Sequence, residues 1–292
     1  MSSVIEAAAA AASVERRGSP TSQLLLDEAA LLLAHAELTK CDDGWITADQ
    51  SRSSLELIPS PTRQRAWRAE IKSLVHRWPD LRILLSDTPD YPAQLLKTGQ
   101  APAMLFVRGA LDGARSLAVV GSRAASEQAT TTAREVGAAL ASAGATVVSG
   151  LARGVDTAAH SGALAAGGRS VAVVGTGIDV VFPPENAGLA GQLSQQGAVV
   201  SQFPPGLEPS KTSFPTRNAV IAGLSDASVI IDAEESSGTR IEMEFALAFS
   251  RPVLLWGPLL CKSDWARTLS AKHDGVHLVG SASEILALAK HG

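Results

Sequence analysis

The stretch Leu117-Ala118-Val119-Val120-Gly121-Ser122-Arg123 joins an apolar run to a small-residue turn that carries a guanidinium group. The apolar residues predict a buried β-strand, and the polar residues that follow Arg123 predict a helix. A strand, a glycine turn and a helix N-terminus form a geometry that receives phosphate, because backbone N–H groups and the positive end of the helix dipole converge there. This segment therefore predicts both a strand of a sheet and an anion-binding turn.

A second segment repeats this pattern farther along the chain. Residues Val147–Asp156 read VVSGLARGVD, another apolar run that breaks into a small-residue turn with an arginine. Two such turns predict a surface that holds a polyanion or a nucleotide.

Apolar runs alternate with helical patterns from Leu117 onward. The expected strands are Leu117–Val120, Thr146–Val148, Ser170–Val174, Ala198–Val200, Ser228–Ile231 and Pro252–Trp256. These runs are continuously hydrophobic, as in a parallel sheet that helices cover on both faces. Helical segments near 129–143, 157–166, 186–196, 217–224 and 240–249 connect them. We therefore expect an α/β fold with an extended Rossmann-like, doubly wound, mostly parallel sheet.

The chain is expected to divide into four parts. They are a tail at residues 1–22, a small helical N-terminal domain at 23–80, a Rossmann core at 81–261 and a C-terminal strand and helix at 262–292. Within the helical domain, the Arg-, Lys- and Trp-rich segment Thr62–Trp78 predicts one amphipathic helix with a solvated basic face. The core is expected to begin with a connector from Leu81, followed by a strand at Pro102–Gly109 on the edge of the main sheet.

Composition limits the classes of function. The chain has 292 residues, a formal net charge of −4 and 4% aromatic residues, so any nucleic-acid binding must come from a local basic patch. Cys41 and Cys261 have no Cys or His neighbours at metal-ligand spacing, which predicts reduced thiols in a cytoplasmic protein. No apolar run approaches the ~18–20 residues of a membrane span. No metal, cofactor or membrane partner is expected.

The usual nucleotide fingerprints are missing. The nearest approach to Gly-x-Gly-x-x-Gly, at Gly175-Thr176-Gly177, lacks the third glycine, and no acidic residue stands where a ribose contact is expected. A Gly-Lys-Ser/Thr phosphate loop is also absent from the sequence. These observations argue against an NAD-dependent enzyme and give no support to ATP hydrolysis.

In an open parallel sheet, ligands bind outside the carboxyl ends of the strands. We call the residues that follow the predicted strands the strand-end rim, and several glycines lie there, where backbone can approach a ligand closely. Arg123, Arg153 and Arg217 supply positive charge on a molecule that is otherwise acidic. The rim is therefore the candidate binding site.

With those residues in view, the chain resembles the DprA/Smf family of DNA-processing proteins. The resemblance extends from about Asp90 to Gly257. The matching motifs are Gly121-Ser122-Arg123, Ser149–Asp156 with Ala159-His160, Val171–Asp179 with Phe182-Pro183 and Glu185-Asn186, Phe214-Pro215-Thr216-Arg217-Asn218, and Ile221–Ser225.

The resemblance implies a non-catalytic protein that binds single-stranded DNA, passes it to a RecA-type recombinase during DNA uptake or recombination, and acts as a homodimer. By position in the motifs, Arg123 and Arg153 are expected to hold phosphates. Gly121, Ser122, Ser149 and Gly150 are expected to shape the groove. Arg217 and Asn218 are expected either to complete the DNA site or to brace it from behind.

One departure from the family pattern motivates a rival enzyme. Gly238-Thr239, followed by Glu242 and Glu244, resembles the glycine-threonine and glutamate signature of nucleotide phosphoribohydrolases. There, a carboxylate can stabilise an oxocarbenium-like transition state. The alternatives are that both carboxylates lie in a solvated first helical turn, favoured by the macrodipole, or that they serve DNA binding. A nucleotide-sensing module without catalysis is a further alternative.

Asp156 and His160 stand four residues apart on a predicted helix, so their side chains are expected to meet. Such a pair can perform acid–base chemistry. A structural hydrogen bond that locks the turn is the favoured interpretation.

Overall fold

The computed structural model describes residues 23–38, 59–112, 115–234 and 238–289. Within these residues one sheet has the strand order β1-β2-β6-β5-β4-β3-β7-β8-β9. The strands are β1 Leu81–Leu85, β2 Met104–Gly109, β3 Ser116–Val120, β4 Thr146–Ser149, β5 Ser170–Val173, β6 Ala198–Ser201, β7 Ala227–Ile230, β8 Val253–Trp256 and β9 Val276–Val279. Strands β3 to β9 pair in parallel, whereas β1 and β2 are antiparallel to their neighbours.

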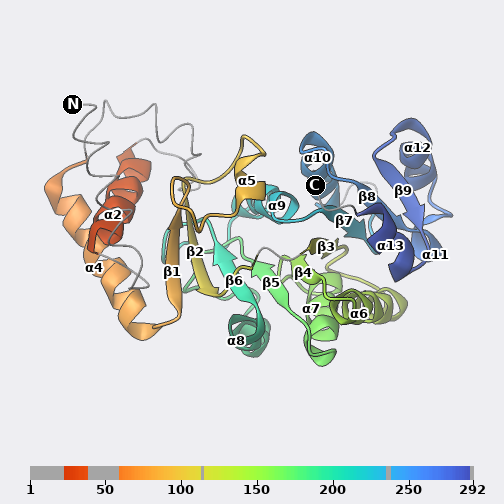
Figure 1. Cartoon of the computed structure of the whole chain (residues 1–292), viewed down its shortest axis with the longest axis horizontal. Helices are drawn as coiled ribbons and strands as arrows, with labels where there is room; N and C mark the ends of the chain where they lie inside the picture. Colours follow the sequence, from red (N-terminus) through yellow and green to blue (C-terminus); the bar gives the residue numbers. More distant parts are fainter. Residues whose placement is uncertain (1–22, 39–58, 113–114, 235–237, 290–292) are drawn as a thin grey trace.

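The helices lie on both faces of this sheet (Figure 1). They are α2 Gln23–Leu38, α4 Pro61–Arg77, α5 Ala93–Leu96, α6 Glu127–Ser142, α7 Val155–Ala165, α8 Ala187–Gln196, α9 Ser213–Gly223, α10 Thr239–Ala248, α11 Gly257–Leu260, α12 Asp264–Lys272 and α13 Ala282–Leu288. In Figure 1, α6, α7 and α8 lie below the sheet, and α5, α9 and α10 lie above it. The predicted fold class, a doubly wound, mostly parallel α/β sheet with a helical N-terminal region, is confirmed.

Local sequence explains the first crossover helix, α6. Ser126 caps it, because its Oγ accepts a hydrogen bond from Ala129 N at 3.1 Å. Ala129, Val136 and Leu140 are buried at helical spacing against the sheet. Gly144, with φ of 82°, ends the helix in the left-handed conformation that glycine adopts without strain.

The antiparallel entry differs from the sequence-based expectation. The connector expected from Leu81 begins instead with strand β1, which pairs with β2 and forms the outer edge of the sheet. The strand predicted at Pro102–Gly109 is present as β2, but it lies between β1 and β6 rather than at the edge. The short run Leu81–Leu85 gives little local signal, and its strand form depends on hydrogen bonds to β2.

The helical N-terminal region shares buried surface with the sheet. One cluster of buried side chains contains Leu33 of α2, Ile71 of α4, Ile83 of β1 and Phe106 of β2. The predicted amphipathic helix is present as α4, with Ile71 and Leu74 buried. Near the C-terminus, the expected strand and helix appear as β9 and α13, while helix α12 was not anticipated.

The direction of winding reverses between β3 and β7. The chain runs from β3 through β4, β5 and β6 on one side, and from β7 through β8 and β9 on the other. Because the two connections leave these adjacent strands in opposite directions, a crevice opens at their carboxyl ends. This switch point sets the position of the candidate site.

Candidate functional site

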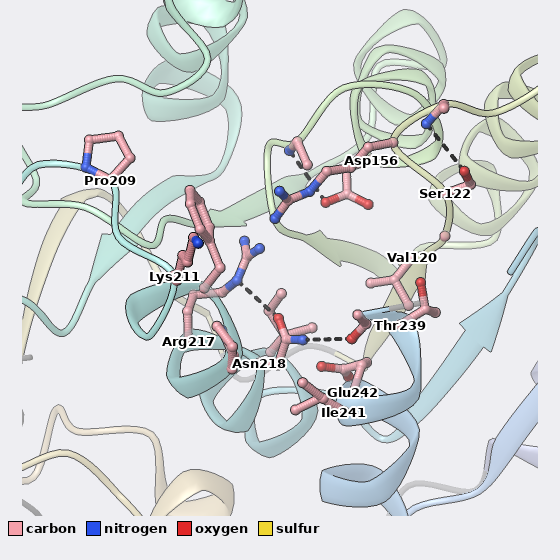
Figure 2. A pocket seen from close by; sticks show the side chains of 18 of the residues that line it. Val120, Ser122, Asp156, Pro209, Lys211, Arg217, Asn218, Thr239, Ile241 and Glu242 are labelled. Atoms are coloured by element: carbon pink, nitrogen blue, oxygen red, sulfur yellow. Dashed lines mark hydrogen bonds between the residues drawn. The ribbon is translucent and has the colours of Figure 1, made fainter. Parts of the chain in front are cut away.

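A pocket of about 730 Å³ lies at the switch point, and its lining comes from four parts of the chain. These are the end of β3 with its following turn, the N-terminus of α7, the connection from β6 into α9, and the start of α10. Figure 2 shows side chains from these segments converging on the pocket. Small-ligand sites have volumes of about 300–1,000 Å³, so the pocket has the size of a binding site.

The turn after β3 is tightly packed into the fold. A Cβ at Gly121 would lie 2.7 Å from Val155 Cγ2 and 2.8 Å from Asp232 O, so only glycine fits there. Ser122 N donates to Asp232 O at 2.8 Å, and Ser122 Oγ accepts from Ala124 N at 3.2 Å. The Ser122 amide therefore links β3 to the end of β7 instead of facing a ligand.

Arg123 is exposed at this turn and lines the pocket. Its Cζ lies 4.7 Å from the ring centroid of Phe214, which is a cation–π arrangement. The Phe214 ring in turn lies 5.7 Å from the Phe182 ring, with a tilted geometry. The guanidinium thus lies over the ring, and because Arg123 is exposed it can also pair with an anion.

The turn after β4 already holds a carboxyl group of the protein itself, whose pKa is raised by burial and lowered in part by Arg217 and by hydrogen bonds from the turn. Asp156, the second residue of α7, is buried, and its Oδ2 accepts from Gly150 N at 3.1 Å and Ala152 N at 3.3 Å. Contrary to the prediction, the N–H groups of Gly150 and Ala152 do not face a ligand, because they donate to the Asp156 carboxyl group. Ser149 is also internal, since its Oγ donates to Val119 O at 2.7 Å.

Arg217 lies behind the turn with only 4% of its surface exposed. Its Nη1 donates to Gly150 O at 2.7 Å and to Val173 O at 2.5 Å, and its Nε donates to Asn218 Oδ1 at 3.1 Å. These bonds join the ends of β4 and β5 to α9. Of the two roles expected for Arg217, the contacts are those of a brace.

Asn218 connects α9 to α10. Its Oδ1 accepts from Arg217 Nε, and its Nδ2 donates to Gly238 O at 3.5 Å (Figure 2). The side chain is half-buried and lines the pocket. It therefore orients the brace and remains within reach of a ligand.

Arg153 is separate from the pocket. It is exposed and forms an ion pair through its Nε with Glu185 Oε1. The hydrogen bond from Arg153 lowers the pKa of the Glu185 carboxyl. The pocket lining includes the neighbouring residue Ala152 but not Arg153, so the two predicted phosphate-binding arginines do not share one pocket. A DNA contact by Arg153 stays a prediction.

The expected contact between Asp156 and His160 is wrong. The Asp156 carboxylate faces the β4 turn, whereas His160 Nδ1 lies 2.7 Å from Ser170 Oγ. Full burial lowers the pKa of His160 to about 3, and the positive charge of Arg217 adds to this effect. The imidazole is therefore neutral at ordinary pH. The turn is locked as anticipated, but by Asp156 and backbone amides.

Two functional candidates in the pocket were missed or misjudged from the sequence. Lys211 is exposed on the pocket wall, and its only local signal is its position just before the Phe-Pro motif of α9. Glu242 is 1% exposed and also lines the pocket, so the expectation of a solvated first turn is wrong for this residue. Glu244 is exposed, as that expectation required.

Two kinds of feature are absent from the described ranges. Among residues 23–38, 59–112, 115–234 and 238–289, no group of three or more His, Cys, Asp or Glu side chains is placed to hold a metal ion. None of the helices formed by those residues has the length and apolar character needed to cross a membrane.

The sheet order and the pocket at the β3–β7 switch point define a Rossmann-like α/β protein with a partly cationic ligand site. The chain belongs to the DprA/Smf family. The family model described as DNA recombination-mediator protein A matches residues 82–290, which confirms the resemblance found in the sequence motifs.

Curated relatives carry the two names of this family. The chain is 34% identical to protein Smf of Synechocystis over 218 residues, which cover 73% of this chain and 55% of that protein. It is 42% identical to protein Smf of Escherichia coli over 62% of this chain and 50% of that protein. It is 39% identical to the DNA processing protein DprA of Streptococcus pneumoniae over 68% of this chain and 70% of that protein. The chain thus spans about half the length of the two Smf relatives.

Solved structures of relatives share the fold. The X-ray structure of DprA from Streptococcus pneumoniae matches with a TM-score of 0.71 and 30% identity, over 92% of this chain and 98% of that chain. A DprA from Helicobacter pylori, whose structure was described for its single-stranded DNA binding mode, matches with a TM-score of 0.63 and 23% identity. That match covers 71% of this chain and 94% of the other, and it supports the fold.

Proposed function

We propose that this chain binds single-stranded DNA across the pocket and the strand-end rim, and passes the strand to a RecA-type recombinase without catalysing a reaction on it. Membership of a recombination-mediator family supports the biological role. The described binding of single-stranded DNA by the Helicobacter pylori protein supports the choice of ligand. The chemistry of the pocket supports its location.

The observation that carries the proposal is the cation–π contact of Arg123 with Phe214 in the pocket lining. Single-stranded nucleic acid binds where cations follow the backbone and aromatic faces accept bases. Arg123 and Lys211 supply exposed cations on the pocket wall, and the half-buried Phe214 supplies a ring. The chain carries a formal net charge of −4, so this local grouping, rather than overall charge, must attract DNA.

The proposed assembly is a homodimer in the cytoplasm. One pocket offers few cations, so the affinity of one protomer for DNA is expected to be modest. In a dimer, binding of a DNA strand to one pocket raises the effective concentration of that strand at the second pocket. Light scattering with and without an oligonucleotide measures the oligomeric state directly.

The decisive experiment is binding of a labelled oligonucleotide, single- or double-stranded, over a salt series. We expect preference for the single strand and an affinity that falls steeply as salt rises, because neutralising phosphates releases counterions. Equal binding of both forms, or no binding at low salt, would contradict the proposal. Recombinase loading is then tested as filament growth on DNA coated with single-strand-binding protein, with and without this chain.

Substitution of Arg123 tests the location. Arg123→Ala is expected to weaken single-stranded DNA binding roughly 10-fold and to reduce the salt slope by about one, as for one lost phosphate contact. The matched control is Arg134→Ala, which removes an exposed arginine of α6 outside the pocket lining. Equal losses in both variants would mean that binding depends on general charge rather than on this pocket.

A second candidate function rests on the burial of Glu242 in the pocket. A buried carboxyl in a pocket that exposed cations also line is compatible with cleavage of the N-glycosidic bond of a nucleoside monophosphate, or with sensing such a nucleotide. Release of free base from nucleoside monophosphates would support the hydrolase. Nucleotide binding without base release, combined with no DNA binding, would support the sensor.

A further inference from the structure

Helix α4 concentrates positive charge near the β1 edge of the sheet, away from the pocket. Its 17 residues include five Arg or Lys and one Glu, in a chain whose formal net charge is −4. The helix packs against β1, which β2, β6, β5 and β4 separate from β3 (Figure 1). Five inter-strand spacings of roughly 4.8 Å amount to about 24 Å. The cations of α4 therefore do not act on a small ligand held by Arg123.

The outward face of α4 carries a row of basic side chains. With 3.6 residues per turn, Arg65, Lys72 and His76 fall within about 40° of arc and span about 17 Å along the helix. Ile71 and Leu74 are buried on the opposite face. Arg65 and Lys72 are exposed, and neither forms an ion pair with any residue that the structure describes. We call Arg65, Lys72 and His76 the α4 row.

The apolar face of α4 decides which polyanion fits the row. A basic amphipathic helix binds a lipid surface by burying its apolar face among the acyl chains. Ile71 and Leu74 are instead packed in the cluster that α4 shares with α2, β1 and β2, so that face is not available to a membrane. Only the charged face is left. Nucleic acid matches it, because duplex DNA carries one negative charge per roughly 1.7 Å of its axis.

The aromatic side chains near the row favour a duplex over a single strand. Trp67 packs against the buried cluster. The ring of Trp78, the C-cap residue, lies 5.5 Å from Arg77 Cζ and 4.4 Å from Arg108 Cζ, measured to its centroid. Sites for single strands offer aromatic faces on which unpaired bases stack. The tryptophans here are already engaged, so the row offers charge alone, which suits a backbone whose bases are stacked within a duplex.

We propose that the α4 row binds the phosphate backbone of duplex DNA, at a second site separate from the pocket. This inference goes beyond the proposed binding of a single strand and does not depend on it. Its affinity is lower than that of the pocket for a single strand, because a few exposed cations act without base stacking. The separation of about 24 Å leaves room for a duplex on α4 while a single strand occupies the pocket.

The experiment titrates the full chain with a labelled duplex of about 20 base pairs, roughly two helical turns, over a salt series. The double variant Arg65→Gln/Lys72→Gln is expected to bind the duplex roughly 10-fold more weakly at low salt. The slope of log affinity against log salt is expected to fall by about two, one for each lost phosphate contact. Binding of a single strand of about four nucleotides, too short to reach both sites, is expected to stay within about 2-fold.

The matched control is Arg134→Gln/Lys272→Gln, which removes the same charge from exposed positions on α6 and α12. We expect its duplex affinity to stay within about 2-fold of the wild type, since exposed charges farther away than a Debye length are screened. Glu70→Gln removes the acidic residue of α4 and is expected to strengthen duplex binding about 2-fold. This variant keeps the test decisive if Arg65→Gln/Lys72→Gln does not fold.

Three results would overturn the inference. They are an unchanged duplex affinity and salt slope in Arg65→Gln/Lys72→Gln, equal losses in the control, and no gain in Glu70→Gln. Vesicles of phosphatidylserine form the remaining arm, and binding to them that is tighter than to the duplex and depends on Lys72 would assign the row to a membrane instead.

The outcomes also separate this inference from the proposed function. Duplex binding that depends on Lys72, without any single-strand binding, would keep the second site and remove the proposed function. Single-strand binding that depends on Arg123, with duplex binding indifferent to Lys72, would do the reverse.

Discussion

Arg217 shows how a motif residue can serve the site without facing the ligand. Its guanidinium bonds the carbonyls at the ends of β4 and β5, and its pKa is lowered by burial, although Asp156 and Glu242 oppose that shift. The hydrogen-bond partners of this guanidinium thus come from within the protein. Arg123 and Lys211, which are exposed, are the residues left to meet an external anion.

Replacing Arg217 is therefore expected to affect stability first. Arg217→Ala leaves the buried carbonyl groups of Gly150 and Val173 without their donor, so the free energy of unfolding should fall by about 2–6 kcal/mol, at roughly 1–3 kcal/mol for each group. Urea denaturation followed by circular dichroism measures this. Arg134→Ala, on the surface of α6, is expected to stay within about 0.5 kcal/mol of the wild type. A stable Arg217→Ala variant that has lost only ligand binding would contradict the bracing role.

The pH dependence of stability follows from buried groups with opposite shifts, since burial raises the pKa of Glu242 and of Asp156 and lowers that of His160. The pKa of Glu242 is about 8 in the folded chain, whereas an unfolded chain releases this proton near pH 4.5, the ordinary pKa of glutamate. The folded chain therefore binds more protons, and the free energy of unfolding should fall as pH rises from about 6.5 to 8. The pKa of His160 is lowered by burial from 6.5 to about 3, so this group acts in the opposite direction. Its contribution to the free energy of unfolding decreases as pH falls from about 6.5 to 3.

Between about pH 4.5 and 6.5 the contributions of Glu242 and His160 to stability oppose each other, so measurements above pH 6.5 are the informative ones. Urea midpoints measured from pH 6.5 to 8 should decline in the wild type by at most about 1.4 kcal/mol per pH unit. Glu242→Gln has no carboxyl to ionise and should give a flatter profile. A decline of the same slope in both proteins would show that another group is responsible.

At the scale of elements, the turn between β4 and α7 is built around its own carboxylate. Gly150 lies between Ser149, bonded to β3, and Leu151, whose φ is 57°. A Cβ at Gly150 would lie 2.0 Å from Arg217 Nη1, so the turn and the brace fit together only with glycine. The Gly-rich sequence therefore reflects close packing within the protein at least as much as access for a ligand.

Gly150→Ala is accordingly expected to displace the Arg217 guanidinium and to lower the free energy of unfolding by at least ~2 kcal/mol. The matched control is Gly188→Ala in helix α8, where a Cβ meets nothing within 4 Å. That change should be neutral or should stabilise by up to about 1 kcal/mol, because alanine favours the helix. Thermal unfolding of the two variants tests the pair. Similar melting temperatures would argue against the close fit at Gly150.

At the scale of the whole molecule, α2 and α4 pack against the antiparallel end of the sheet. Ile71 of α4 is fully buried in the cluster that also holds Ile83 and Phe106. A separate helical domain, as predicted at residues 23–80, would unfold independently of the sheet. The buried cluster shared by α2, α4, β1 and β2 favours cooperative unfolding instead. Helices that share a core with a sheet are expected to unfold together with it.

Ile71→Ala tests this coupling, because deleting a buried isoleucine side chain costs about 2–5 kcal/mol. We expect the unfolding transition of the sheet, followed by hydrogen exchange at β5 and β6, to move to lower urea concentration. Protection of β5 and β6 that does not change, alongside faster exchange in α4, would instead show an independent helical domain.

The sequence by itself determined the order of strands, turns and crossover helices, because continuous apolar runs and glycine turns are local patterns. It also located the rim at the carboxyl ends, since parallel strands share one direction. It did not reveal β1, which depends on pairing with β2, or that Asp156 occupies the amides of its own turn. The strand order brings β3 beside β7, and this long-range contact decides which groups line the pocket. Only tertiary structure could therefore bury Arg217 and Glu242 and leave Arg123 and Lys211 exposed, because burial depends on neighbours distant in the chain.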